Sequence, residues 1–177
     1  TLIENSGEVD RIYAVNDLVL IEKDEQIEIV EEKGSKITKS GIFMSSSPGS
    51  LPDFKIREAL HDGENYFIIG ETYIVKTKDL YSIESIPMSG CDAEFGIIYE
   101  DFLIVGCPRN SGGSGHTYVY DKDLNLVKTI LGNLHAEDGI IKDGKLFLFA
   151  QNSDYSIDNT ETVYILNKDL SIYKTVK

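Results

Sequence analysis

Thr117-Tyr118-Val119-Tyr120, followed by Lys122-Asp123-Leu124, is the stretch that decides the fold. It is an alternating apolar and polar segment that ends in a polar turn. The Lys-Asp-Leu triplet occurs again 44 residues earlier, at Lys78-Asp79-Leu80, and 46 residues later, at Lys168-Asp169-Leu170. One more step back lands on Lys33-Gly34-Ser35, which also favours a turn. Because an alternating segment lies on both sides of each triplet, the pattern predicts a recurring β-hairpin.

A second predicted hairpin precedes each of these hairpins. Its second strand is a nearly continuous apolar run, found at residues 18–21, 66–69, 102–105 and 146–149. Such a run is typical of a strand that is covered on both faces. The repeating unit is therefore four antiparallel strands in about 45 residues, the size of one β-propeller blade. A two-sheet β-sandwich is the alternative, but a sandwich does not need an in-register fourfold repeat.

The sequence thus predicts an all-β chain, a β-propeller of four four-stranded antiparallel blades in a single domain over 1–177. The approximate repeats are 4–42, 43–86, 87–130 and 131–177. Thr1-Leu2-Ile3 aligns with Thr129-Ile130-Leu131, which suggests the end of a strand from a preceding blade. The repeats fit both a closed four-bladed ring and a part of a larger propeller. The chain begins at Thr1 and not at a methionine, which is expected if a leader was removed or if the chain is a fragment.

The third and fourth repeats carry a family resemblance. Residues 117–121, 127–130 and 139–141, with a glycine-containing loop between the last two, resemble the YVTN-type propeller repeats. The second repeat departs from the pattern at Pro52-Asp53-Phe54. The resemblance implies a propeller fold. It does not choose a function, because that superfamily includes both lactonase-like enzymes and pure scaffolds.

The charge of the chain limits its partners. Its formal net charge is −13, and a nucleic acid would be repelled because affinity for phosphates depends on Lys and Arg. No apolar run approaches the ~20 residues that span a bilayer, so we expect no membrane insertion. The expected interaction is therefore with a protein partner or with further copies of the chain. Extracellular or surface localisation is favoured over a cytoplasmic one.

Long polar connections are predicted at one end of the blades and tight turns at the other. Binding residues tend to lie on loops that a rigid scaffold holds, so we expect a partner site on the long-loop side. These loops can also be merely tolerated insertions. The candidate partner-binding residues are Arg109, Asn110, His116, Asp154, Tyr155 and Asp158.

A tier of acidic residues is predicted near the blade axis. Aligning the repeats places Asp10, Glu94 and Glu137 in equivalent positions, with Ile56 in the second blade. Converging carboxylates repel one another unless a cation bridges them, and oxygen ligands suit Ca²⁺ or Mg²⁺. Alternatively the carboxylates point to solvent. His135, one position sideways in a neighbouring tier, is a weak candidate proton carrier.

Two cysteines complete the set of candidate residues. Cys91 and Cys107 flank the hairpin that turns near Tyr99, so the strands should bring them together. A disulfide there would indicate an oxidising compartment or a thermophile, and two reduced, packed thiols are the alternative.

No catalytic motif is visible. We therefore expect a non-catalytic binding or structural module without a cofactor, in a surface or particle assembly. A cation-dependent, lactonase-like hydrolase is the alternative.

Overall fold

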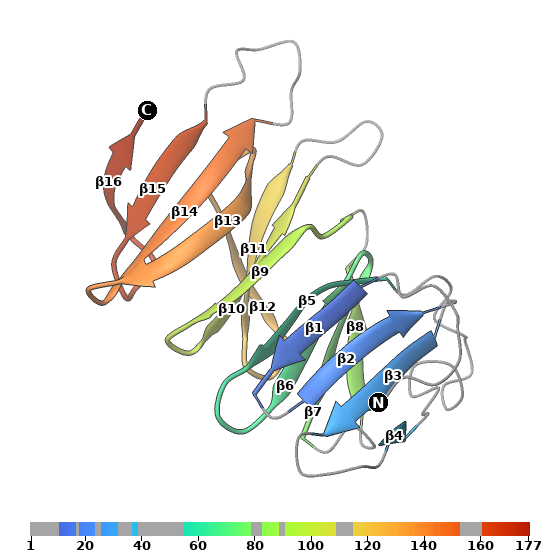
Figure 1. Ribbon diagram of the computed structural model, residues 1–177. Helices are drawn as coiled ribbons and strands as arrows, with labels where there is room; N and C mark the ends of the chain where they lie inside the picture. Colours follow the sequence, from blue (N-terminus) through green and yellow to red (C-terminus); the bar gives the residue numbers. More distant parts are fainter. Residues whose placement is uncertain are drawn as a thin grey trace. The chain divides into compact units, whose positions relative to one another are not determined.

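The computed structural model describes residues 11–16, 18–23, 26–31, 37–38, 55–78, 83–88, 91–108, 115–152 and 161–177. Within these residues the chain forms sixteen strands, arranged in four antiparallel four-stranded sheets (Figure 1). The chain divides into two compact units, Thr1–Ser85 and Ile86–Lys177, and each is described by itself. The described part contains no helix with the length and apolar character that membrane crossing requires.

Unit 1 contains the first and second sheets, with strands in sequence order in each. The first sheet is formed by β1 (Arg11–Val15), β2 (Leu18–Lys23), β3 (Gln26–Glu31) and β4 (Ile37–Thr38). The second is formed by β5 (Ile56–His61), β6 (Tyr66–Gly70), β7 (Tyr73–Thr77) and β8 (Ile83–Pro87), whose last two residues fall in unit 2.

These two sheets pack through their apolar faces. Leu20 of β2 and Ile56 of β5 are fully buried in a common cluster, together with Ile68. Tyr13 packs against this cluster, and its hydroxyl donates a hydrogen bond to the Ile56 carbonyl. Tyr13 is partly buried, and the hydrogen bond offsets the cost of removing its hydroxyl from water while its ring adds apolar area to the cluster.

Unit 2 contains the third and fourth sheets, with the same order of strands. The third sheet is formed by β9 (Phe95–Tyr99), β10 (Phe102–Cys107), β11 (His116–Asp121) and β12 (Leu126–Ile130). The fourth is formed by β13 (Leu134–Lys142), β14 (Lys145–Asn152), β15 (Thr162–Leu166) and β16 (Ile172–Val176).

The core of unit 2 lies between its two sheets. Ile104 and Val119 of the third sheet pack against Leu146, Leu148 and Leu166 of the fourth, and all five side chains are completely buried. Each such aliphatic side chain contributes roughly 1.5–3 kcal/mol when it leaves water. Packing between successive sheets therefore stabilises the unit.

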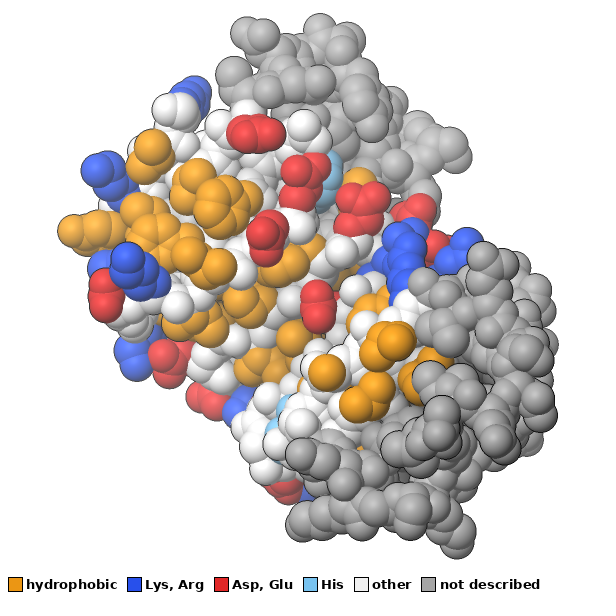
Figure 2. Space-filling view, in the orientation of Figure 1, with side chains coloured by type: hydrophobic (Ala, Val, Ile, Leu, Met, Phe, Trp, Pro, Cys, Tyr) orange, Lys and Arg blue, Asp and Glu red, His pale blue; other side chains and the backbone are white. Residues whose placement is uncertain are grey.

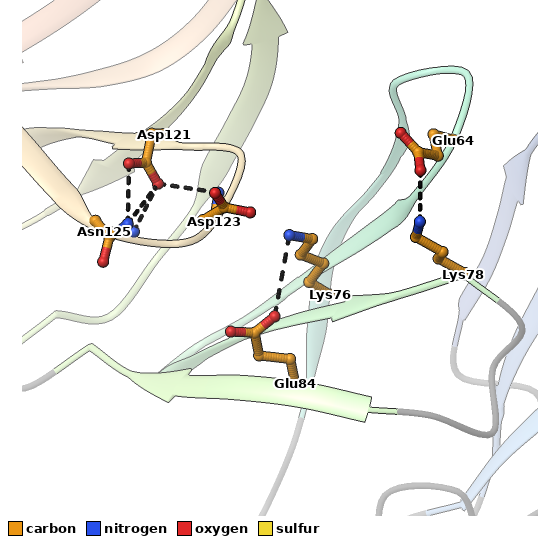
Figure 3. A network of polar contacts seen from close by, with 7 residues as sticks. All are labelled: Glu64, Lys76, Lys78, Glu84, Asp121, Asp123 and Asn125. Atoms are coloured by element: carbon orange, nitrogen blue, oxygen red, sulfur yellow. Dashed lines mark hydrogen bonds and ion pairs between the residues drawn. The ribbon is translucent and has the colours of Figure 1, made fainter.

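In the third and fourth sheets, the Lys-Asp-Leu triplet forms the turn between the last two strands. In the third sheet, Asp121 accepts hydrogen bonds from the backbone N–H groups of Asp123 and Asn125, at 2.9 and 2.8 Å (Figure 3). Leu124 has φ of 60°, an unusual value for a branched residue, and it is buried. Leu170 of the fourth sheet repeats this geometry with φ of 63°. The leucine of the triplet is thus buried at a positive φ in both turns, which accounts for its recurrence.

The structure confirms the predicted four-stranded sheets and corrects one detail. The run 146–149 was expected to be covered on both faces, yet Phe149 is 41% exposed while Leu148 is fully buried. The side chains of β14 thus alternate between a covered and an open face.

Candidate functional site

The third and fourth sheets have a long-connection end, defined here as the end where the chain leaves β10 for β11 and β14 for β15. Register places Cys107 opposite His116 at this end of the third sheet. It places Ala150 opposite Thr162 at the corresponding end of the fourth sheet. Residues 109–114 and 153–160, between these strands, lie outside the described part.

A disulfide joins Cys91 and Cys107 at this end. The two Cα atoms are 5.2 Å apart, and both side chains are buried. The backbone N–H of Cys91 donates to the Met88 carbonyl at 3.1 Å. The disulfide therefore fixes the segment that enters β9 to the end of β10.

The side chain of Thr117 ties β11 to β13 next to the disulfide. Its hydroxyl donates to the Leu134 carbonyl at 3.1 Å and accepts from the Ala136 N–H at 2.9 Å. The two backbone groups lie on either side of His135, and Thr117 is completely buried. One hydroxyl thus satisfies two backbone groups and holds the two sheets together.

Backbones approach each other closely at the same place. A Cβ added to Gly106 of β10 would lie 1.8 Å from the carbonyl oxygen of Ala136. The Gly106 carbonyl also accepts from the N–H of Glu94, at 3.1 Å. Glu94 and Glu137 are therefore brought to one end of the unit, each next to this Gly106–Ala136 junction.

His135 and Glu137 form a pair beside the junction. Their Nε2 and Oε1 atoms are 3.3 Å apart, with the imidazole buried and the carboxylate 39% exposed. Register shifts between Ala136 and Asp138, so Glu137 occupies a β-bulge. Bulges re-aim side chains and often occur near functional sites. β13 begins at Leu134, so His135 lies within a strand and is buried.

The strand register changes one residue assignment in the predicted acidic tier. Ile56 pairs with Gly70 just before a bulge in the second sheet, as Ala136 pairs with Ala150 before the bulge in the fourth. The counterpart of Glu137 is therefore Arg57 and not Ile56. Arg57 forms an ion pair with Glu71 at 2.5 Å. The alignment by sequence alone set Ile56 against Glu137, one residue away from the counterpart that the strand register gives.

The predicted cation site stays a prediction. Asp10, one of its three carboxylates, lies outside the described residues. Among the residues that the structure describes, no group of three or more His, Cys, Asp or Glu side chains could hold a metal ion. Glu94 and Glu137 are exposed at the long-connection end, as the alternative interpretation requires.

The predicted partner-binding residues also remain predictions. His116 is the first residue of β11 and is half-buried, with its ring 5.6 Å from that of Tyr118. The other five lie outside the described part of the chain: Arg109, Asn110, Asp154, Tyr155 and Asp158.

The opposite end of unit 2 carries the tight turns. There the Tyr99 hydroxyl donates to the Gly144 carbonyl at 2.8 Å, and burial raises the pKa of Tyr99. Lys168 forms an ion pair with Glu100 at 2.8 Å, and its hydrogen bond with that carboxylate raises the pKa of Lys168. These contacts also join the two sheets, so both ends of the unit are fixed.

Sequence reasoning missed Thr117 and Gly106. A signal for the threonine was present, since Thr72, Thr117 and Thr162 occupy the same position of successive repeats. The closeness of Gly106 to Ala136 depends on how two sheets pack, and no local pattern encodes it.

Comparisons with known proteins place the fold. No family model and no curated protein matches the chain. Among solved structures, the WD40 domain of Neurospora crassa Pan2 matches with a TM-score of 0.61 and 15% identity, over 96% of this chain and 50% of that one. Hsv2p of Kluyveromyces lactis matches with a TM-score of 0.55 and 12% identity, over 94% of this chain and 51% of that one.

These likenesses support a β-propeller fold, and the narrower resemblance to YVTN-type repeats stays a prediction. The chain spans about half the length of these solved structures. At such low identity the likeness concerns the fold alone.

Proposed function

We propose that this chain is a non-catalytic propeller module that binds a protein partner at the long-connection end of its third and fourth sheets. The observation that carries the proposal is the cross-linking of the strand ends here, where the Thr117 hydroxyl and the Cys91–Cys107 disulfide hold three strands. A site that is ordered before binding loses little entropy on association. Binding residues are common on loops that a rigid scaffold holds, and the propeller fold provides such a scaffold.

The charge of this end suggests the chemistry of the partner. Glu94 and Glu137 are exposed on either side of the Gly106–Ala136 junction, and the whole chain has a net charge of −13. Complementary potentials steer association and exclude like-charged partners. The proposed partner therefore presents lysine or arginine side chains. The disulfide favours an oxidising location, such as a cell surface.

Photo-crosslinking tests the proposal without knowledge of the partner. A photoreactive residue replaces Glu94, Glu137 or, as a matched control, the exposed acidic Asp143 at the tight-turn end. We expect the same protein adduct from positions 94 and 137, weakened by added salt because the contact is between charges, and none from 143. Equal adducts from all three positions, or an adduct from 143 alone, would overturn the proposal.

A further inference from the structure

The fourth sheet has one face that lies outside the core of unit 2, and we call it the open face. On the other face, Leu146, Leu148 and Leu166 belong to the core and are completely buried. Successive residues of a strand point to opposite faces, so the residues between these leucines belong to the open face. There Ile140 is 50% exposed and Phe149 is 41% exposed. The exposure of large apolar side chains is therefore a property of one whole side of the sheet.

The strand register defines the apolar residues of the open face. Directly opposed residues of neighbouring strands share a face, and each apolar member lies opposite another one. These members are Ile140, Phe147, Phe149, Val163, Ile165 and Val176. Figure 2 shows apolar side chains gathered over this sheet. A contiguous apolar surface across four strands is typical of a contact with another protein.

Opposite charges lie at the two ends of the open face. Asp138 pairs with Phe149 toward the long-connection end, and Lys142 pairs with Lys145 next to the tight turn. Lys174 on the outer strand β16 also lies on this face. Asp138 and Lys142 are exposed, and neither forms an ion pair with a residue that the structure describes. They are four residues apart on one strand, roughly 13 Å, so they cannot pair with each other.

A second copy of the same face supplies the matching charges. When two such faces meet about a twofold axis with their strands antiparallel, the acidic end of each lies against the basic end of the other. Asp138 of each copy then faces Lys142 of the other copy, and the two Ile140 side chains meet at the centre. Lys174 stays at the outer edge, where water and salt screen its charge.

The two charged ends favour this occupant over a partner of uniform charge. A partner surface that carries only basic side chains would match Asp138 and be repelled by Lys142, and a purely acidic one would have the reverse problem. The open face itself carries both signs at the required separation. Its charge pattern is therefore self-complementary.

We propose that this chain forms a symmetric dimer in which the open face of the fourth sheet packs on the same face of a second copy. Burial of apolar area supplies the affinity, and the contacts between Asp138 and Lys142 fix the orientation. Packing of one apolar sheet face on another already forms the core inside each unit. The dimer goes beyond the proposed function and does not rest on it, because a monomeric chain still presents Glu94 and Glu137.

Sedimentation velocity over a range of concentrations tests this dimer with charge reversals. The samples are wild type, Asp138→Lys, Lys142→Glu and the control Asp101→Lys, which makes the same charge change at an exposed residue of the third sheet. We expect wild type and the control to form dimers of the 19.8 kDa chain. Each variant of the open face places like charges against each other at both ends of the contact, so its dimer should be weaker by at least about tenfold.

The mixture of Asp138→Lys and Lys142→Glu is the decisive sample. In the mixed dimer, the new lysine of one chain meets the new glutamate of the other, and the unchanged Asp138 and Lys142 meet at the other end. The mixture should therefore dimerise at concentrations at which neither variant does so alone. A wild type that stays monomeric at all concentrations would overturn the proposal, and so would charge variants that dimerise as wild type does, a mixture that stays monomeric or a control that dissociates.

Ile140→Asp tests the apolar centre of the contact separately from its charged ends. Two carboxylates would meet across the axis without partners, so this variant should stay monomeric. Ile140 is half exposed, so the change leaves the core of unit 2 intact and stays informative if Asp138→Lys does not fold. Dimerisation of Ile140→Asp at the wild-type concentration would show that the open face is not the contact.

Discussion

Gly106 shows how one residue sets the distance between two sheets. Its position requires no positive φ, so an alanine would be free of backbone strain. The added Cβ would nevertheless lie 1.8 Å from the Ala136 carbonyl oxygen, which belongs to a backbone that cannot move easily. Close approach of two backbones, and not conformational freedom, therefore explains this glycine.

Substitution of Gly106 by alanine should destabilise unit 2 substantially. We expect a loss of about 3 kcal/mol in the free energy of unfolding, because the clash forces the sheets apart. Gly132→Ala is the control, since that site has φ of 65° and open space, and its cost is strain of about 1 kcal/mol. Urea denaturation measures both variants, and an equal loss in the two would contradict the close contact.

Tyr120 should titrate unusually late. Burial, assisted by the charge of the nearby Tyr118 when ionised, raises the pKa of Tyr120 to about 12 from an ordinary 10.0. The folded state thus keeps a proton that the unfolded state loses, so stability falls as pH rises from 10 toward 12. Tyr120→Phe should lose less stability over this range. Melting curves at several alkaline pH values check this, and parallel curves for the two proteins would contradict it.

At the scale of elements, the turn before the last strand of the third and fourth sheets explains why the triplet recurs in the sequence. Asp121 and Asn167 begin equivalent turns, and Leu124 and Leu170 adopt positive φ while their side chains are buried. In the second of these turns, the Ser171 hydroxyl and backbone N–H lower the pKa of Asp169. The recurrence of the triplet follows from this geometry, which is why it predicted the hairpins.

Leu170→Ala should cost about 2–4 kcal/mol of unfolding free energy, because it removes a buried side chain from the turn. Leu126→Ala is a matched change at a leucine that is 56% exposed, and it should cost less than about 0.5 kcal/mol. Chemical denaturation of the two variants provides the comparison. Equal costs would show that the turn leucine contributes little to the core.

The Cys91–Cys107 disulfide stabilises the third sheet. It closes a loop with a sequence separation of 16 residues, for which the chain-entropy model gives about 3 kcal/mol. Reduced protein should therefore unfold at a lower urea concentration than oxidised protein. Unchanged stability after complete reduction, verified by thiol titration, would contradict this account.

At the scale of the whole molecule, sequence predicted more of the fold than of the site. The repeat located all four sheets because alternation and turn chemistry are local properties. The burial of His135 and the bulge at Glu137 were missed, since both depend on pairing with β14 and packing against the third sheet. The same dependence explains Phe149, whose exposure is decided by what covers the sheet and not by its own sequence.

Hydrogen–deuterium exchange with and without the crosslink-identified partner tests the central claim most directly. The account predicts added protection at the long-connection end, in peptides covering residues 91–94, 115–117 and 134–137, since binding there limits local opening. It predicts no change in the tight turns at residues 122–125 and 143–144. Protection confined to those turns, with the long-connection end unchanged, would contradict it.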